Sequence, residues 1–174
     1  MLRLSTVFIS IILVNILALG GFNVWQAKAV EHTQIDLKDV LKDKAACRSL
    51  VIDYAYHRDQ GHAGELAKLF TQDAQLIVMG NKIEGREAIE QRVADAKSGP
   101  LLRHMMSTIR IVLIDKDHAS GVSYVTVYSS PAGTLPLPLT EFSALGEYHD
   151  EFVRTVEGWK IQSRQFIPVF VPPS

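Results

Sequence analysis

Apolar residues recur at the helical period through the first half of the domain. Between about residues 36 and 58 their spacing is three, four and seven positions, as in an amphipathic helix (Val40, Cys47, Leu50, Val51 and Tyr54). Gly61 favours a helix end there. Two shorter helices are predicted, the first closed by residues 71–73 and the second opened by residues 85–87 and ended by Gly99-Pro100 (apolar faces Leu66, Leu69 and Phe70; Ile89, Val93 and Ala96).

From residue 101 onward the pattern changes to the alternation that is typical of strands. Four long strands are predicted, beginning with the one that carries His104 (residues 101–114, 119–128, 142–155 and 159–170). A shorter strand is predicted over residues 74–79, between the second and third helices. Residues 129–138 hold three prolines and one glycine and predict a long loop, suited to cover the sheet as a lid.

Helices followed by a run of antiparallel strands predict an α+β fold. In such folds the helices pack on one face of a curved sheet. A sheet half covered in this way encloses a pocket, where small apolar ligands bind. The order of the elements therefore predicts one domain over residues 30–174 with a small-molecule site inside it.

The first 29 residues form a separate segment with the features of an export signal. Arg3 supplies a positive start, residues 7–19 are almost all apolar, and Ala27-Lys28-Ala29 has the small-x-small pattern that signal peptidase cleaves. Residues 30–33 are polar and are interpreted as a tether. We expect an exported protein, either periplasmic or secreted.

An uncleaved membrane anchor is the alternative for the N-terminal segment. Residues 7–25 approach the roughly 20 apolar residues that a bilayer span requires. The interruption at Gly20-Gly21 favours cleavage over anchoring. In either case, any membrane contact would be made only through this segment.

Composition and charge argue against several functional classes. The formal net charge is −1, and no cluster of basic and aromatic residues is present, so a nucleic-acid partner is not predicted. Cys47 is the only cysteine, so the chain forms no internal disulfide, and its place on an apolar helix face favours packing over nucleophilic chemistry. His57, His62 and His104 do not have zinc-motif spacing, so no metal site is predicted.

His104 is the candidate for acid-base chemistry. Its ordinary pKa range allows a histidine to act as a general base or acid near neutrality. A core histidine satisfied by the backbone or by water is the alternative. Strand parity places His104 on the face of Met106 and Thr108, opposite Ile109 and Ile111. Either that face lines a mixed pocket, or a bulge switches the parity.

Six short motifs in order resemble the SnoaL-like branch of the nuclear-transport-factor-2-like superfamily. They span nearly all of the chain after the N-terminal segment (Tyr54-x4-Asp59, Leu69-Phe70-x2-Asp73, Gly85-Arg86-x2-Ile89, Arg103-His104, Gly146-x-Tyr148-x-Asp150 and Gly158-Trp159). The branch includes polyketide cyclases, scytalone dehydratase, bile-acid dehydratases and relatives of ketosteroid isomerase. The resemblance implies a cone-shaped α+β barrel around a deep apolar cavity, homo-oligomers and chemistry without a cofactor.

The resemblance also implies three catalytic positions, Tyr54, Asp59 and His104. Proton removal beside a carbonyl needs a base of near-neutral pKa and a donor for the developing oxyanion. His104 fits the first role and Tyr54 the second, with Asp59 holding the imidazole in one tautomer. Tyr54 also fits a purely structural role as a buried helix tyrosine. Candidate substrate contacts lie on the two neighbouring strands (Met106, Thr108, Tyr124 and Tyr128).

Some features of the chain depart from the family pattern. Some catalytic members have a second acid or histidine on the strand after the Arg-His strand, whereas residues 122–128 contain neither. Thr108 stands where an asparagine is common. Tyr148, Asp150 and Arg154 alternate on one strand face and are interpreted as framework hydrogen bonding. Two functions stay open: a lyase or isomerase acting on a small apolar oxygenated molecule, and a non-catalytic binding or assembly module.

Overall fold

The computed structural model describes the backbone of residues 22–139 and 142–173, and side chains from residue 37 onward within these ranges. Most of the predicted export signal, residues 1–21, lies outside the described residues. The chain divides into two compact units, residues 1–38 and residues 39–174. The fold and site below belong to the second unit. No helix among the described residues combines the length and apolar character needed to cross a bilayer.

The long predicted helix is present as α1 (Phe22–Gln60) and starts earlier than expected. Residues 30–33, interpreted as a tether from their polarity, lie within α1. Residues 22–60 contain neither glycine nor proline, so nothing in the local sequence breaks the helix. In the second unit, α1 buries Cys47, Val51 and Tyr54 in the core. Burial raises the pKa of the Cys47 thiol to about 12, as suits a packing residue.

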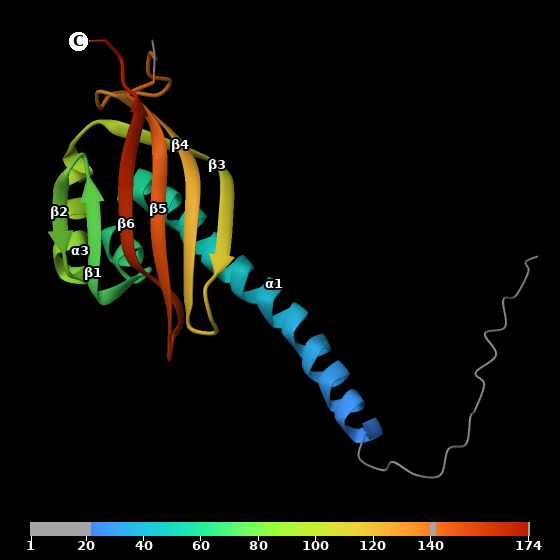
Figure 1. Ribbon diagram of the computed structural model, residues 1–174. Helices are drawn as coiled ribbons and strands as arrows, with labels where there is room; N and C mark the ends of the chain where they lie inside the picture. The colour runs from blue at the N-terminus through green and yellow to red at the C-terminus, as the bar shows by residue number, and fades with distance from the viewer. Residues whose placement is uncertain (1–21, 140–141, 174) are drawn as a thin grey trace, which may run out of the picture. The chain divides into compact units, whose positions relative to one another are not determined.

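Six strands form one curved, unclosed sheet in the order β2-β1-β6-β5-β4-β3 (Figure 1). Neighbouring strands are antiparallel except β1 and β6, which are parallel. The predicted α+β fold is confirmed. The strand bounds are β1 (Phe70–Val78), β2 (Asn81–Glu84), β3 (Leu101–Leu113), β4 (His118–Ser130), β5 (Ala144–Thr155) and β6 (Gly158–Phe170).

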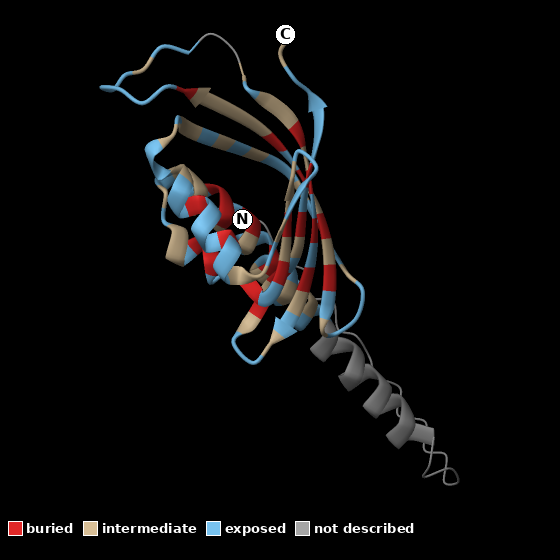
Figure 2. Ribbon diagram, turned by 90° about the vertical axis from the view of Figure 1, so that its left-hand side faces the viewer, coloured by how far each residue is buried: buried red, intermediate tan, exposed pale blue. Residues whose placement is uncertain are grey.

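Helices α2 (Ala63–Ala67) and α3 (Arg86–Asp95) pack with α1 against one face of the sheet, and buried residues concentrate between the two layers (Figure 2). A short 3-10 helix, η1 (Ala96–Ser98), follows α3. The second helix ends before Phe70, which had been predicted on its apolar face. Phe70 instead begins β1 because its backbone pairs with Ile161 of β6, and the Arg86 guanidinium donates to its carbonyl.

A β-bulge in β3 settles the parity of the strand that carries His104. The register against β4 shifts between Ser107 and Arg110, and Thr108 has a φ of +46°. One extra residue switches the inward face, so His104 precedes the bulge on the inner face and Ile111 follows it on the same face. Of the two alternatives that the sequence left open for His104, the structure confirms the bulge.

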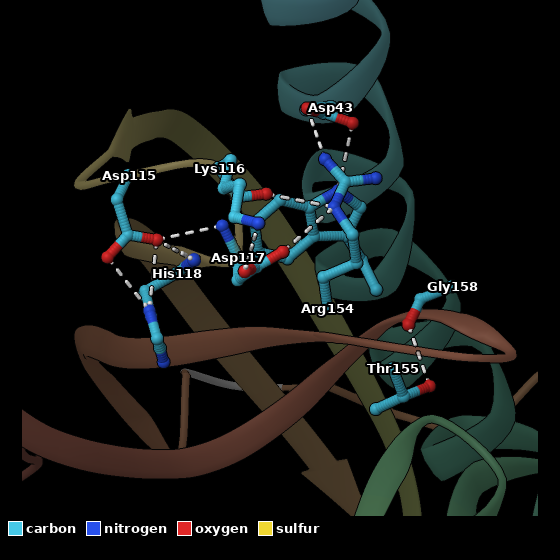
Figure 3. A network of polar contacts seen from close by, with 9 residues as sticks. Asp43, Asp115, Lys116, Asp117, His118, Arg154, Thr155 and Gly158 are labelled. Atoms are coloured by element: carbon cyan, nitrogen blue, oxygen red, sulfur yellow. Dashed lines mark hydrogen bonds and ion pairs between the residues drawn. The ribbon is translucent and has the colours of Figure 1, made fainter.

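Arg154 ties the β5–β6 hairpin to α1 and to the β3–β4 turn (Figure 3). Its guanidinium pairs with Asp43, donates to the carbonyl of Lys116 at 2.9 Å, and stacks on the Trp159 ring at 4.6 Å. The indole of Trp159 donates to Asp43 at 3.0 Å. Trp159 is therefore buried hairpin packing, as predicted from its place after Gly158.

Candidate functional site

A pocket of about 240 Å³ lies between the helices and the inner face of the sheet. Most of its lining is apolar, with polar groups from α1, α3, β3 and β5 (Tyr54, Arg58, Leu76, Val78, Met79, Ile83, Arg92, Val93, Leu102, His104, Val127, Ala144, Tyr148 and Phe166). Two residues of the predicted trio, Tyr54 and His104, thus line one pocket. A mostly apolar cavity with a few converging polar groups is the usual form of a small-molecule site.

Asp59 holds His104 through both carboxylate oxygens. Oδ1 lies 2.5 Å from the ring Nδ1 of His104, and Oδ2 accepts the backbone N–H of the same residue at 2.8 Å. The two side chains are only 7% and 9% exposed, His104 being the more buried. The carboxylate therefore fixes both the ring and the strand that carries it, 45 positions away in the sequence.

The contact with Asp59 also assigns the tautomer of His104. An ionised carboxylate only accepts hydrogen bonds, so Nδ1 carries the proton and Nε2 holds a lone pair. Among the described residues, no group bonds Nε2. The ring thus offers a free base at the pocket, with a carboxylate placed to stabilise the imidazolium once a proton has been taken.

Tyr54 and Tyr148 bring two hydroxyl groups to the same pocket. Burial raises the pKa of both, and the positive charges of Arg164 and Arg58 offset part of the rise for Tyr54. The two rings meet edge to face, with their centres 5.6 Å apart. Tyr54 therefore stays protonated, and its own O–H remains available to donate to a ligand.

A buried ion pair packs against the rings of these two tyrosines. The guanidinium of Arg164 forms two 2.7 Å hydrogen bonds with Asp150, and both side chains are fully buried. The same guanidinium lies 4.1 Å from the ring centre of Tyr54 and 4.6 Å from that of Tyr148. This stacking fixes the rings by cation-π contacts. Asp150 had been grouped with Arg154 in the sequence, whereas its partner is Arg164.

The proposed substrate contacts on β4 lie away from the pocket. His104 pairs with Val127 and Met106 with Val125, so these residues face inward, while Tyr124 and Tyr128 face the other side of the sheet. Tyr124 is 45% exposed. The structure therefore does not place Tyr124 and Tyr128 at the site, because side chains alternate along a strand.

The two β3 candidates also lie outside the pocket lining. Met106 faces inward but packs against the hydrophobic core. Thr108 is exposed at the bulge, where the extra residue turns it off the inner face. Of the seven residues proposed from the sequence, the structure brings together His104, Asp59 and Tyr54.

Sequence reasoning missed several residues at or behind the pocket. Arg164 faces inward only because β6 has a bulge at Gln162, where the register shifts between Ile161 and Ser163. The change in apolar phase between Ile161 and Phe166 was the available signal. Arg58 falls four positions after Tyr54, a helical spacing that places both on one face. For Arg92 on α3, no pattern in the sequence indicated a place in the pocket.

The Pro-rich segment predicted as a lid lies beside a neighbouring pocket. Ala132 and Gly133 line a cavity of about 230 Å³ together with Arg58 and Asp59. None of the described loop residues 131–139 lines the pocket of His104. Within the ranges with described side chains, no three His, Cys, Asp or Glu residues gather in a way that could hold a metal ion.

Comparison with known proteins connects this geometry to a family. The family described as the SnoaL-like domain matches residues 39–165. The chain belongs to the SnoaL-like domain family. An uncharacterised protein of Mycobacterium tuberculosis is 30% identical over 127 residues, which cover 71% of this chain and 84% of that protein. The matched region of this SnoaL-like domain contains every residue of the pocket lining except Phe166, which follows its last matched position.

Solved structures show the same fold. A scytalone dehydratase-like protein from Novosphingobium aromaticivorans has a TM-score of 0.67 at 23% identity, covering 79% of this chain and 91% of that chain. A type 2 hexachlorocyclohexane dehydrochlorinase has a TM-score of 0.67 at 19% identity, covering 78% and 91%. At these identities the likeness concerns the fold of the SnoaL-like domain, which is the nuclear-transport-factor-2-like fold expected from the motifs.

Proposed function

We propose that this SnoaL-like domain is a cofactor-independent lyase or isomerase of the dehydratase type, acting on a small, largely apolar oxygenated molecule. The observation that carries the proposal is the 2.5 Å contact between Asp59 and His104 beside an apolar pocket. A tautomer-fixed imidazole with a free Nε2 is suited to proton transfer at carbon. Structures named for a dehydratase and a dehydrochlorinase share the fold, and both names denote eliminations.

The proposed reaction needs only groups that the pocket supplies. His104 Nε2 takes a proton from a carbon next to a carbonyl, and the electrons of the C–H bond form an enolate. In a dehydration the enolate re-forms the carbonyl and expels a β-hydroxyl, which leaves as water with the proton of the imidazolium. In an isomerisation the imidazolium returns its proton to another carbon. Either route restores neutral His104.

Tyr54 is proposed to stabilise the enolate oxygen. Its hydroxyl keeps its proton because burial raises its pKa. A donor whose ring is stacked on Arg164 is held in place before the charge develops. The apolar lining strengthens this interaction by excluding water.

A binding module with the same cavity is the second candidate. It is favoured by one observation: the pocket lining from β4 is Val127 alone, so the strand next to His104 adds no acid or second histidine. The pairing of Asp59 with His104 weighs against it, because ligand binding alone does not need an imidazole held in one tautomer.

The test begins with mass spectrometry of small molecules that copurify with the full chain. We expect a compound with a carbonyl group and a neighbouring C–H bond, which the wild-type protein converts to a product lighter by one water or to an isomer. His104→Ala should bind the compound and return it unchanged. Equal conversion by this variant contradicts the mechanism, and binding without conversion by the wild-type protein supports the binding module.

We also propose that the domain acts outside the cytoplasm, after export directed by residues 1–29. The proposal is supported by the apolar run at residues 7–19 and the Ala27-Lys28-Ala29 site. N-terminal sequencing of the protein from the exported fraction of a bacterial host should give Val30 as the first residue. A start at Met1 would instead indicate an uncleaved anchor.

A further inference from the structure

The pocket is lined by basic side chains and, among the described residues, by no carboxylate. Arg58 and Arg92 contribute guanidinium groups, His104 contributes the imidazole, and no Asp or Glu among the described residues lines the cavity. The Asp59 carboxylate, which is not part of the lining, is already bound through both oxygens to His104. An otherwise apolar pocket in a chain of formal net charge −1 thus carries a local positive charge.

Neither arginine has a hydrogen-bond or ion-pair partner in the described part of the chain. Among the residues whose side chains are described, no hydrogen-bond acceptor or acidic partner contacts the guanidinium of Arg58 or Arg92. Most other arginines of the domain have such contacts, as Arg48, Arg86, Arg103, Arg154 and Arg164 do. An arginine that a pocket holds without a protein partner is free to pair with a ligand.

The two arginines reach the pocket from different helices. Arg58 lies four residues after Tyr54 on α1 and is half-buried, and its charge lowers the pKa of Tyr54. Arg92 lies on α3 beside the buried Val93 and is exposed. The exposure of Arg92 places its charge near solvent, while the apolar lining from β1, β2 and β6 forms the rest of the cavity.

We infer that the substrate carries a carboxylate, which Arg58 and Arg92 bind while the apolar body of the molecule fills the pocket. This inference deepens the proposed function, on which it rests, by naming the substrate class. The planar guanidinium fork matches a carboxylate in geometry and charge. A carboxylate held in this way would fix the substrate in the pocket that His104 and Tyr54 line.

The test compares acids with their neutral isosteres. Isothermal titration of the full chain with 2-naphthoate and 2-naphthamide, and with benzoate and benzamide, measures the preference for a carboxylate without any need for turnover. We expect each acid to bind at least about tenfold more tightly than its amide, which corresponds to about 1.4 kcal/mol. The preference should shrink as salt concentration rises, because Arg92 is exposed.

Variants assign the preference to the two arginines. Arg58→Gln and Arg92→Gln should each weaken binding of the acid by about tenfold and leave binding of the amide unchanged. Arg58→Lys keeps the charge but loses the fork, so its effect should be smaller. Arg103→Gln is the matched control, because Arg103 precedes His104 but is exposed and, within the described part of the chain, hydrogen-bonds the carbonyl of its neighbour Leu102. It should bind both probes as the wild type does.

Several outcomes would overturn the inference. Equal binding of acid and amide, or a preference that survives both glutamine variants, would show that the arginines do not select a carboxylate. Tighter binding of 2-naphthyl phosphate than of 2-naphthoate would assign the site to another anion, and no binding of any probe would also count against it. Failure of the proposed function would give a different result. The wild type and His104→Ala would both bind the acid more tightly than the amide, and the wild-type protein would convert no compound.

Discussion

Replacing His104 by alanine is expected to lower kcat for the identified substrate by about 10²- to 10⁴-fold, the usual contribution of a positioned general base. Asp59→Asn should have an effect nearly as large. The asparagine amide can donate to Nδ1, which would move the ring proton to Nε2 and remove the lone pair from the pocket side. Stopped-assay measurement of kcat and KM for both variants checks the prediction.

A variant that carries both changes shows whether Asp59 and His104 act as one catalytic pair or independently. If Asp59 acts only through His104, then the variant that carries both changes should be no slower than His104→Ala alone. Independent roles would instead multiply the two losses. KM should change little, because the apolar lining and the two arginines bind the substrate in this proposal.

A second histidine-carboxylate contact in the chain supplies the control. His118 Nδ1 lies 2.9 Å from Asp115 Oδ2 in the exposed β3–β4 turn (Figure 3), and neither residue lines the pocket. His118→Ala and Asp115→Asn remove the same kind of interaction where no substrate reaches it. Both should leave kcat unchanged. A loss as large as that of His104→Ala would mean that the assay reports folding rather than chemistry.

The sequence predicted the layers of the fold well because hydrophobic periodicity is a local property. The face of α1 that carries Cys47, Val51 and Tyr54 is buried as its spacing required. The start of β1 was misplaced since Phe70 suits a helix face equally well, and only its pairing with Ile161 of β6 decides the matter. Such pairing joins positions far apart in the chain, where spacing carries no information.

Bulges limited the prediction of the site. The bulge at Thr108 restores His104 to the inner face, and the bulge at Gln162 does the same for Arg164. Each shifts a strand by one residue, and neither follows from composition. Tyr124 and Tyr128 are a different case, because their alternation with Val125 and Val127 already placed them on the outer face. Their assignment to the substrate gave side-chain chemistry more weight than parity.

Replacing Arg164 by methionine is expected to destabilise the fold by about 3–5 kcal/mol, the usual cost of breaking a buried ion pair. The change leaves the Asp150 carboxylate without its two 2.7 Å hydrogen bonds at a position with no exposed surface. It also removes the cation that stacks on Tyr54 and Tyr148. Urea unfolding followed by far-UV circular dichroism should show a lower midpoint with an unchanged slope.

Most of this cost comes from leaving the Asp150 charge buried without a partner, rather than from losing the interaction energy of the pair. A double variant tests that explanation. Asp150→Leu combined with Arg164→Met removes both charges, so it should recover much of the stability lost in Arg164→Met. The exposed pair of Glu65 and Lys68 is the control, and Glu65→Gln should leave the midpoint unchanged. If the double variant recovers none of the lost stability, then the cost does not come from the isolated Asp150 charge, and the loss of the guanidinium stacked on Tyr54 and Tyr148 accounts for it.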